Sequence, residues 1–190
     1  RHSLFFFFVR SVCRASDESS SSNVPPWSNP VLPERIATKK KKNNVRFRQH
    51  VNPLARQYQQ TTLLPEQWPQ SVFTDCSKPL HLDIGCGKGG FLLDLAKVDD
   101  SFNYLGLEIR PTVALYAKER ICKHNLTGRL DFLGCNANVD LDRILNLYPN
   151  LGLVSIQFPD PHFKTQHAKR RVVSANLVNT LAKFMSQSAR

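Results

Sequence analysis

Glycines and a distant carboxylate in residues 80–110 have the spacing of a site for an anionic, ribose-containing ligand. The stretch reads LHLDIGCGKGGFLLDLAKVDDSFNYLGLEIR, and an apolar run at 80–84 leads directly into Gly85, Gly87, Gly89 and Gly90. Such a loop lets the backbone approach a ligand closely, and free N–H groups at the start of a following helix favour a negative group. Glu108 ends a second apolar run, where a carboxylate can accept both hydroxyl protons of a ribose. An adenosine with an anionic tail therefore fits this stretch.

The glycine loop alone leaves the cofactor class open. Gly85, Gly87 and Gly90 match the G-x-G-x-x-G fingerprint of nicotinamide and flavin enzymes. Together with Asp83, the loop also matches the D-x-G-x-G-x-G pattern of S-adenosylmethionine-dependent methyltransferases, in which the carboxylate lies near the methionine ammonium group. A plain glycine turn is the third possibility. The loop favours the methyltransferase, and the rest of the chain must decide.

Alternating strands and helices are expected to position these residues. Apolar runs predict strands at 80–84, 104–107, 130–133 and 151–157. Helical spacing between these runs predicts helices, three of them at 111–124, 141–147 and 174–186. This alternation predicts an α/β, Rossmann-like parallel sheet with right-handed crossovers. Ligands bind such sheets at the carboxyl ends of the strands, where Gly85, Glu108, Asn136 and Asp160 all fall.

A second signature follows the fourth predicted strand and reads FPDPHFKTQHAKRR over residues 158–171. Prolines on both sides of Asp160 stiffen the loop and hold its carboxylate at the edge of the sheet. The residues that follow mix cationic and aromatic side chains, which suits phosphate contacts and base stacking. A merely solvated basic loop is the alternative.

Asn136 and Ala137 follow the third predicted strand, where the edge of an adenine would lie. The side-chain amide or the backbone could pair with that edge. An asparagine that caps the next turn is an equally good interpretation.

Three motifs together resemble the tRNA (guanine-N7-)-methyltransferases, a family of class I S-adenosylmethionine-dependent methyltransferases. These are DIGCGKGGF (83–91), LGLEIR (105–110) and residues 158–171, whose H-F-K form looks more like the eukaryotic members than the usual bacterial P-W form, so the chain looks plant-like. The resemblance covers roughly residues 76–186 and implies methyl transfer from S-adenosylmethionine to N7 of a guanine in the variable loop of tRNA. It implies cofactor contacts at Asp83, Gly85, Gly87, Glu108, Ile109, Arg110, Asn136 and Ala137. It makes Asp160 the acidic residue of the catalytic site, and it implies tRNA contacts at Lys164, Lys169, Arg170 and Arg171. Many bacterial members have an aspartate in place of Asn136.

The chain divides by composition into a basic tail and a domain. Residues 1–60 hold 11 Lys/Arg and 3 Asp/Glu, a net charge of +8, whereas the whole chain carries +11. We expect a disordered tail over 1–50, a linker with a short helix over 51–75, and a partial methyltransferase domain over 76–190. Arginine and serine without acids in the first sixteen residues suit a transit peptide to a chloroplast or mitochondrion. Nucleus or cytoplasm is the alternative.

Other classes of function find little support in the composition. The five cysteines form no C-x-x-C pair, so no metal site is predicted, and the apolar run at 4–9 is too short to span a membrane. The chain begins with Arg1 and stops where family members continue with further strands, so a sheet incomplete at its C-terminus and a chain truncated at both ends are expected. A non-catalytic RNA-binding or partner-binding fragment, or a methyltransferase with another substrate, therefore stays open. A nuclear-type member would need a WD-repeat partner subunit, and an organellar one would work alone.

Overall fold

Four parallel strands form the sheet that carries the candidate site. The computed structural model describes residues 50–160, 162 and 164–185, so all but the last residue of the tail expected over 1–50 lies outside the described residues. The strands are β1 (Leu80–Ile84), β2 (Asn103–Glu108), β3 (Leu130–Gly134) and β4 (Leu151–Ser155), in the order β3-β2-β1-β4. All three neighbouring pairs are parallel, which confirms the predicted Rossmann-like α/β fold.

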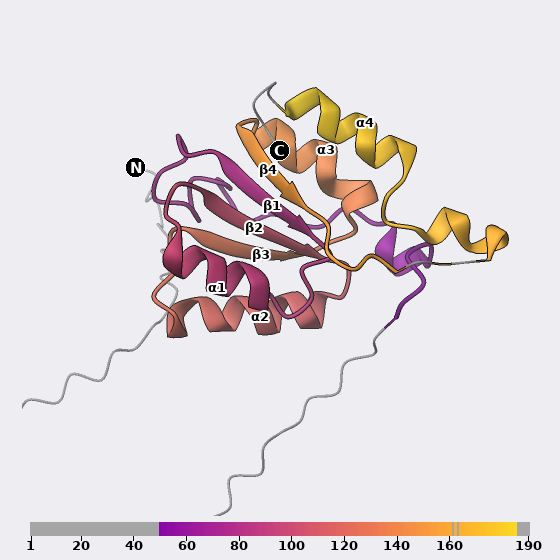
Figure 1. Cartoon of the computed structure of the whole chain (residues 1–190), viewed down its shortest axis with the longest axis horizontal. Coiled ribbons are helices and arrows are strands. Elements are labelled where there is room, and N and C mark those ends of the chain that lie inside the picture. Colours follow the sequence, from indigo (N-terminus) through magenta and orange to yellow (C-terminus); the bar gives the residue numbers. More distant parts are fainter. Residues whose placement is uncertain (1–49, 161, 163, 186–190) are drawn as a thin grey trace, which may run out of the picture. The chain divides into compact units, whose positions relative to one another are not determined.

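Helices cover both faces of the sheet. Helices α1 (Gly90–Val98) and α2 (Pro111–Lys123) lie on one face, and α3 (Ala137–Leu147) and α4 (Ala175–Phe184) on the other (Figure 1). Side chains alternate along the strands, so that Leu105 packs with α3 and α4 while Tyr104 packs with α1 and α2. Two buried clusters, one on each face, therefore hold the sheet in place.

The turn from β1 into α1 requires glycine at residue 89. Gly89 has φ of 72°, and a Cβ added there would overlap the ring of Phe132 on β3. Both the left-handed backbone and the close approach exclude a larger residue. The first crossover can therefore pack tightly against the sheet only with this residue.

Local signals place the starts of the other helices. Pro111 occupies the first turn of α2, where its missing N–H costs nothing. The Asn136 side chain caps α3 by accepting from the Asn138 N–H at 3.1 Å. Ser174 caps α4 in the same way, accepting from the Leu177 N–H at 3.1 Å.

The folded unit reaches further toward the N-terminus than the sequence suggested. Trp68 and Phe73 lie within the stretch expected to be a linker, yet their side chains are only 4% and 2% exposed. Phe73 meets Tyr148 edge-on, with ring centroids 5.6 Å apart, and both join the cluster under α3 and α4. Large aromatic rings bury much apolar surface, so residues 51–75 belong with the domain. The short helix expected there is a single turn, η1 (Arg56–Tyr58).

Strand β4 is less covered than its neighbours. Its residues after Leu151 are only partly buried, while every residue of β1 is buried. Leu151 also forms an isolated parallel bridge with Met185. Within the part of the chain that the structure describes, no helix is long and apolar enough to cross a membrane.

Candidate active site

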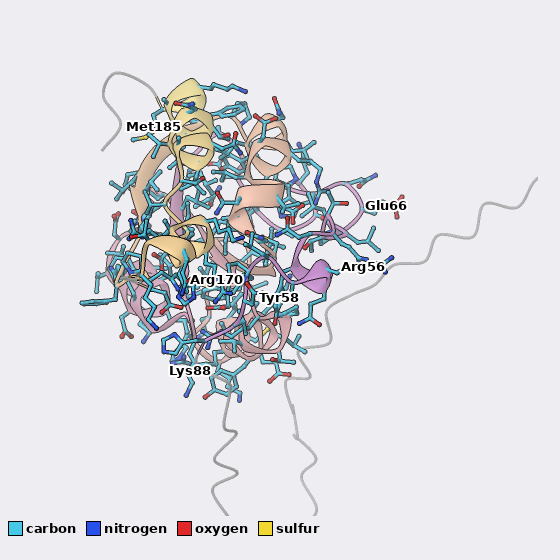
Figure 2. All side chains as sticks on the ribbon, turned by 90° about the vertical axis from the view of Figure 1, so that its right-hand side faces the viewer. Arg56, Tyr58, Glu66, Lys88, Arg170 and Met185 are labelled. Atoms are coloured by element: carbon cyan, nitrogen blue, oxygen red, sulfur yellow. The ribbon has the colours of Figure 1, made fainter. Side chains whose placement is uncertain are left out.

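A cleft of about 360 Å³ opens at the carboxyl ends of the strands. Its walls come from residues at the ends of all four strands, from the segment on both sides of η1, and from the basic turn η2 (Thr165–Arg170). Figure 2 is turned toward this end of the sheet, with Arg56 and Tyr58 on the purple turn and Arg170 on the orange one. A volume of this size is within the range of roughly 300–1,000 Å³ typical of ligand sites.

Glu108 is a rigid acceptor at the end of β2. The residue is only 3% exposed, and Arg110 grips its carboxylate through Nε–Oε1 at 2.8 Å and Nη2–Oε2 at 3.0 Å. The backbone N–H of Arg110 also donates to Oε1 at 3.0 Å. The hydrogen bonds to Glu108 raise the pKa of Arg110 above its ordinary value. Because each carboxylate oxygen can accept more than one hydrogen bond, Glu108 can still accept from a ribose diol.

Strand register brings the glycine loop beside Glu108. Ile84 pairs with Leu107, and the Gly85 N–H donates to the Leu107 carbonyl at 2.8 Å. Gly85 and Gly87 have φ of 83° and 56°, and a Cβ built at either would meet nothing within 4 Å. The loop therefore leaves open space in which a ligand can approach the backbone.

Asp83 is enclosed by the sheet. Its side chain is 2% exposed, and it accepts a hydrogen bond from the Ser155 hydroxyl at 2.9 Å. The same hydroxyl lies 3.2 Å from Nε2 of His81. Burial raises the pKa of Asp83 above its ordinary value. Of the described residues, Ile84 and Gly85 line the cleft at this point and Asp83 does not.

Both polar atoms of the Asn136 side-chain amide already form hydrogen bonds within the protein. Its oxygen caps α3, and its Nδ2 donates to the Tyr58 carbonyl at 3.0 Å and the Pro53 carbonyl at 3.4 Å. The capping interpretation is therefore confirmed. A contact with an adenine would fall to the backbone around Ala137, which also lines the cleft.

A segment that sequence reasoning missed forms one wall of the cleft. Residues 50–62, which we call the strap, contribute Val51, Pro53, Leu54 and Gln59 to its lining. The local signals were the short helix expected there and the Asn52-Pro53 pair, which is typical of turns, and neither indicates a ligand site.

Asp160 faces the cleft from the loop after β4. Its carboxylate meets Nδ1 of His50, the first residue of the strap, at 2.9 and 3.0 Å for the two oxygens. Lys169, Arg170 and Arg171 line the cleft beside it. The Arg171 guanidinium donates to the His162 carbonyl at 3.2 Å, which holds the end of the basic segment against the loop.

Comparison with known proteins agrees with this geometry. Residues 77–190 match a family model described as a putative methyltransferase. The tRNA (guanine-N(7)-)-methyltransferase of Nostoc sp. is 47% identical over 75% of this chain and 64% of its own length. The enzymes of the same name from Synechococcus elongatus and Thermosynechococcus vestitus are each 48% identical, over 76% and 77% of this chain and 68% and 67% of their own lengths.

The chain belongs to the tRNA (guanine-N7-)-methyltransferase family. It spans about two thirds of the length of these curated relatives. Most of the contacts implied by this methyltransferase family lie around the one cleft, namely Gly85, Glu108, Ile109, Arg110, Asn136, Ala137, Asp160, Lys169, Arg170 and Arg171. Among the described residues, Asp83, Gly87 and Lys164 are not part of its lining. Lys164 is exposed just before η2.

Proposed function

We propose that this protein transfers a methyl group from S-adenosylmethionine to N7 of a guanine in tRNA. One observation carries the proposal: the buried carboxylate of Glu108 and the carboxylate of Asp160 face a single cleft, next to three basic side chains. The Glu108 carboxylate can bind a ribose, the Asp160 carboxylate can bind a base, and the basic side chains can bind a nucleic-acid backbone. Relatives that are 47% and 48% identical over the aligned residues bear the name of that activity.

The residues present fit S-adenosylmethionine. The open space at Gly85 in the cleft lining would admit the methionine part, and Glu108 would accept the ribose hydroxyls. The adenine would lie toward Ala137, at the start of α3. When bound, this cofactor supplies a sulfonium-activated methyl group.

Methyl transfer to guanine N7 requires the protein mainly to orient the reactants and to stabilise charge. N7 has a free lone pair and no proton, so attack on the methyl carbon forms the N–C bond while the S–C bond breaks, and no general base is needed. Rate acceleration then comes from in-line positioning and electrostatics. The alkylated guanine gains positive charge, so the Asp160 carboxylate stabilises the transition state. It can also accept hydrogen bonds from the Watson–Crick edge and so select guanine.

The basic segment would hold tRNA by its phosphates. Lys169 and Arg171 are exposed and Arg170 is half-buried, and all three line the cleft. Cationic side chains that neutralise phosphates release counterions, so binding would weaken steeply with salt. We also propose that the target is the guanine of the variable loop, and that the protein works without a WD-repeat partner.

The deciding experiment uses the purified full chain alone. Calorimetry measures the binding of S-adenosylmethionine, and unmodified tRNA is then added to the same sample and digested for 7-methylguanosine. Binding followed by transfer supports the proposal. Binding without transfer would favour the non-catalytic fragment, and transfer to another substrate class but not to tRNA would overturn the substrate.

Compartment is a separate proposal. We propose delivery to a chloroplast or mitochondrion, supported by the acid-free N-terminal sequence rich in arginine and serine. A fluorescent protein fused after residue 190 tests it, because a nuclear or cytoplasmic signal would contradict the proposal.

A further inference from the structure

The strap lies over the part of the cleft assigned to adenosine. It contributes four lining residues, and two of its carbonyls, at Pro53 and Tyr58, accept from the Asn136 amide. In Figure 1 the purple turn that carries Tyr58 lies at the end of the sheet to which the strand arrows point. The adenosine end of the site therefore has one wall that does not come from the sheet or its helices.

The end of the strap is fastened to the core at Thr62. Its N–H lies 3.2 Å from both carboxylate oxygens of Asp140, in the first turn of α3. Its hydroxyl donates to the Gly134 carbonyl at 3.1 Å. Arg143 donates to the Thr62 carbonyl and pairs with Asp140 at 2.7 Å. All the polar groups of Thr62 are thus held, and we call Thr62, Asp140 and Arg143 the latch.

The latch contains a buried carboxylate, whose lost hydration would be unfavourable if the latch only stabilised α3. Asp140 is fully buried, at 0% exposure, and a buried carboxylate needs close partners to offset its lost hydration. One of those partners is the backbone N–H of the strap residue Thr62, which lies 78 positions upstream and contacts both carboxylate oxygens, and the other is Arg143. An apolar side chain at residue 140 would pack the helix against the core but could not fix the path of the strap. The Asp140 carboxylate is therefore suited to fixing the position of the strap.

We propose that Asp140 and Arg143 are positioning residues of the cofactor site, which act by holding the strap over the adenosine end. Neither residue lines the cleft in the described part of the chain, so neither touches the cofactor. This inference rests on the proposed function, since it assumes that S-adenosylmethionine occupies the cleft. When the latch opens, the strap carbonyls no longer face Asn136 and the adenosine loses one wall.

The test compares Asp140→Asn with Asp142→Asn in the full chain. Asp142 is on the same helix but is exposed and pairs with Lys183 at 3.2 Å, away from the strap. Calorimetry measures the affinity for S-adenosylhomocysteine and for 5′-methylthioadenosine, which lacks the amino-acid part. Asp140→Asn should weaken both by the same factor, about tenfold, as expected for loss of one buried charge-assisted hydrogen bond. Asp142→Asn should stay within about twofold.

A second measurement follows the strap itself. Arg56 is exposed in η1, so limited trypsin digestion reports on release of the strap. Cleavage there should speed up in Asp140→Asn and slow down when S-adenosylhomocysteine is added. If Asp140→Asn fails to fold, Thr62→Val keeps the backbone contact and loses only the hydroxyl bond to Gly134. It should weaken both ligands by about threefold.

Each failure has a separate signature. If the unmodified protein binds neither ligand, the proposed function fails. If it binds both and Asp140→Asn binds them equally well, with only a lower melting temperature, the latch is merely structural and the inference is overturned. A loss confined to S-adenosylhomocysteine would also overturn it, because the strap would then act on the amino-acid end.

Discussion

Nδ1 of His50 lies 2.9 and 3.0 Å from the two carboxylate oxygens of Asp160, although 110 residues separate them in the chain. The imidazole is nearly equidistant from both oxygens, so it occupies the face that a donor with two adjacent N–H groups would use. The Watson–Crick edge of guanine is such a donor. On the proposed function, the first residue of the strap would therefore compete with the guanine base for the same carboxylate.

Replacing His50 by alanine should relieve this competition. We expect the KM for tRNA in His50→Ala to fall by about threefold, the size of one exposed hydrogen bond. The affinity for S-adenosylhomocysteine should not change, because Thr62 and Asn136 still hold the strap. Steady-state kinetics with unmodified tRNA give the answer, with His124→Ala as the control histidine. A raised KM together with a lower kcat would mean instead that His50 holds Asp160 in its working position.

Asp160 itself should matter for the transfer step rather than for cofactor binding. Asp160→Asn keeps the shape of the side chain but removes the charge that opposes the developing positive charge on guanine. We expect single-turnover transfer to slow by about 100-fold, in line with the loss of one well-placed electrostatic group. The affinity for S-adenosylhomocysteine should be unchanged. Normal methylation by this variant would disprove the electrostatic role.

Glu108 should control cofactor affinity. Glu108→Gln keeps one acceptor but loses the charge that Arg110 fixes at 2.8 Å. We expect the dissociation constant of S-adenosylhomocysteine to rise by about tenfold or more, because charge-assisted hydrogen bonds are the stronger ones. Glu119→Gln, an exposed position on α2, is the matched control. Equal affinities in the two variants would remove Glu108 from the ribose site.

The sheet and half of the site could be predicted because their signals are local. An apolar run, a glycine turn and a terminal acid lie within one stretch, and register then places Gly85 beside Glu108. Asp160 was equally visible, because its two flanking prolines are adjacent in sequence. Patterns of this kind need no knowledge of distant contacts.

The strap could not be predicted because its contacts are distant and individually polar. Thr62 meets Asp140 across 78 positions, and His50 meets Asp160 across 110. A short helix was expected in this region, and η1 (Arg56–Tyr58) is there, but a helical pattern does not show that the segment lies against the strand ends. Trp68 was missed for the same reason, since a lone aromatic residue in a proline-containing stretch does not indicate which face it covers.

The basic segment should set the salt dependence of tRNA binding. We expect the combined variant Lys169→Ala, Arg170→Ala and Arg171→Ala to lower the slope of log K against log salt by about 2 to 3, since each phosphate contact contributes about 0.7–0.9. Binding should weaken for every tRNA sequence alike. Lys183→Ala, on α4 and paired with Asp142, should leave the slope unchanged. An unchanged slope in the combined variant would show that these residues do not meet phosphates.

Asp83 should make the stability of the fold depend on pH. Burial raises its pKa in the folded state above the value in the unfolded chain, so the native state binds the proton more tightly. The resulting stabilisation is present at low pH and is lost as pH rises through the folded-state pKa.

Asp83→Asn cannot ionise and can still accept from Ser155, which donates at 2.9 Å. We therefore expect this variant to melt at a higher temperature than the parent at pH 7 and at a similar temperature near the acidic limit of folding. Melting curves across this pH range test the prediction, with exposed Asp142→Asn as the control. A variant that is less stable than the parent at pH 7 would mean that the ionised carboxylate of Asp83 stabilises the fold, against the direction of its pKa shift.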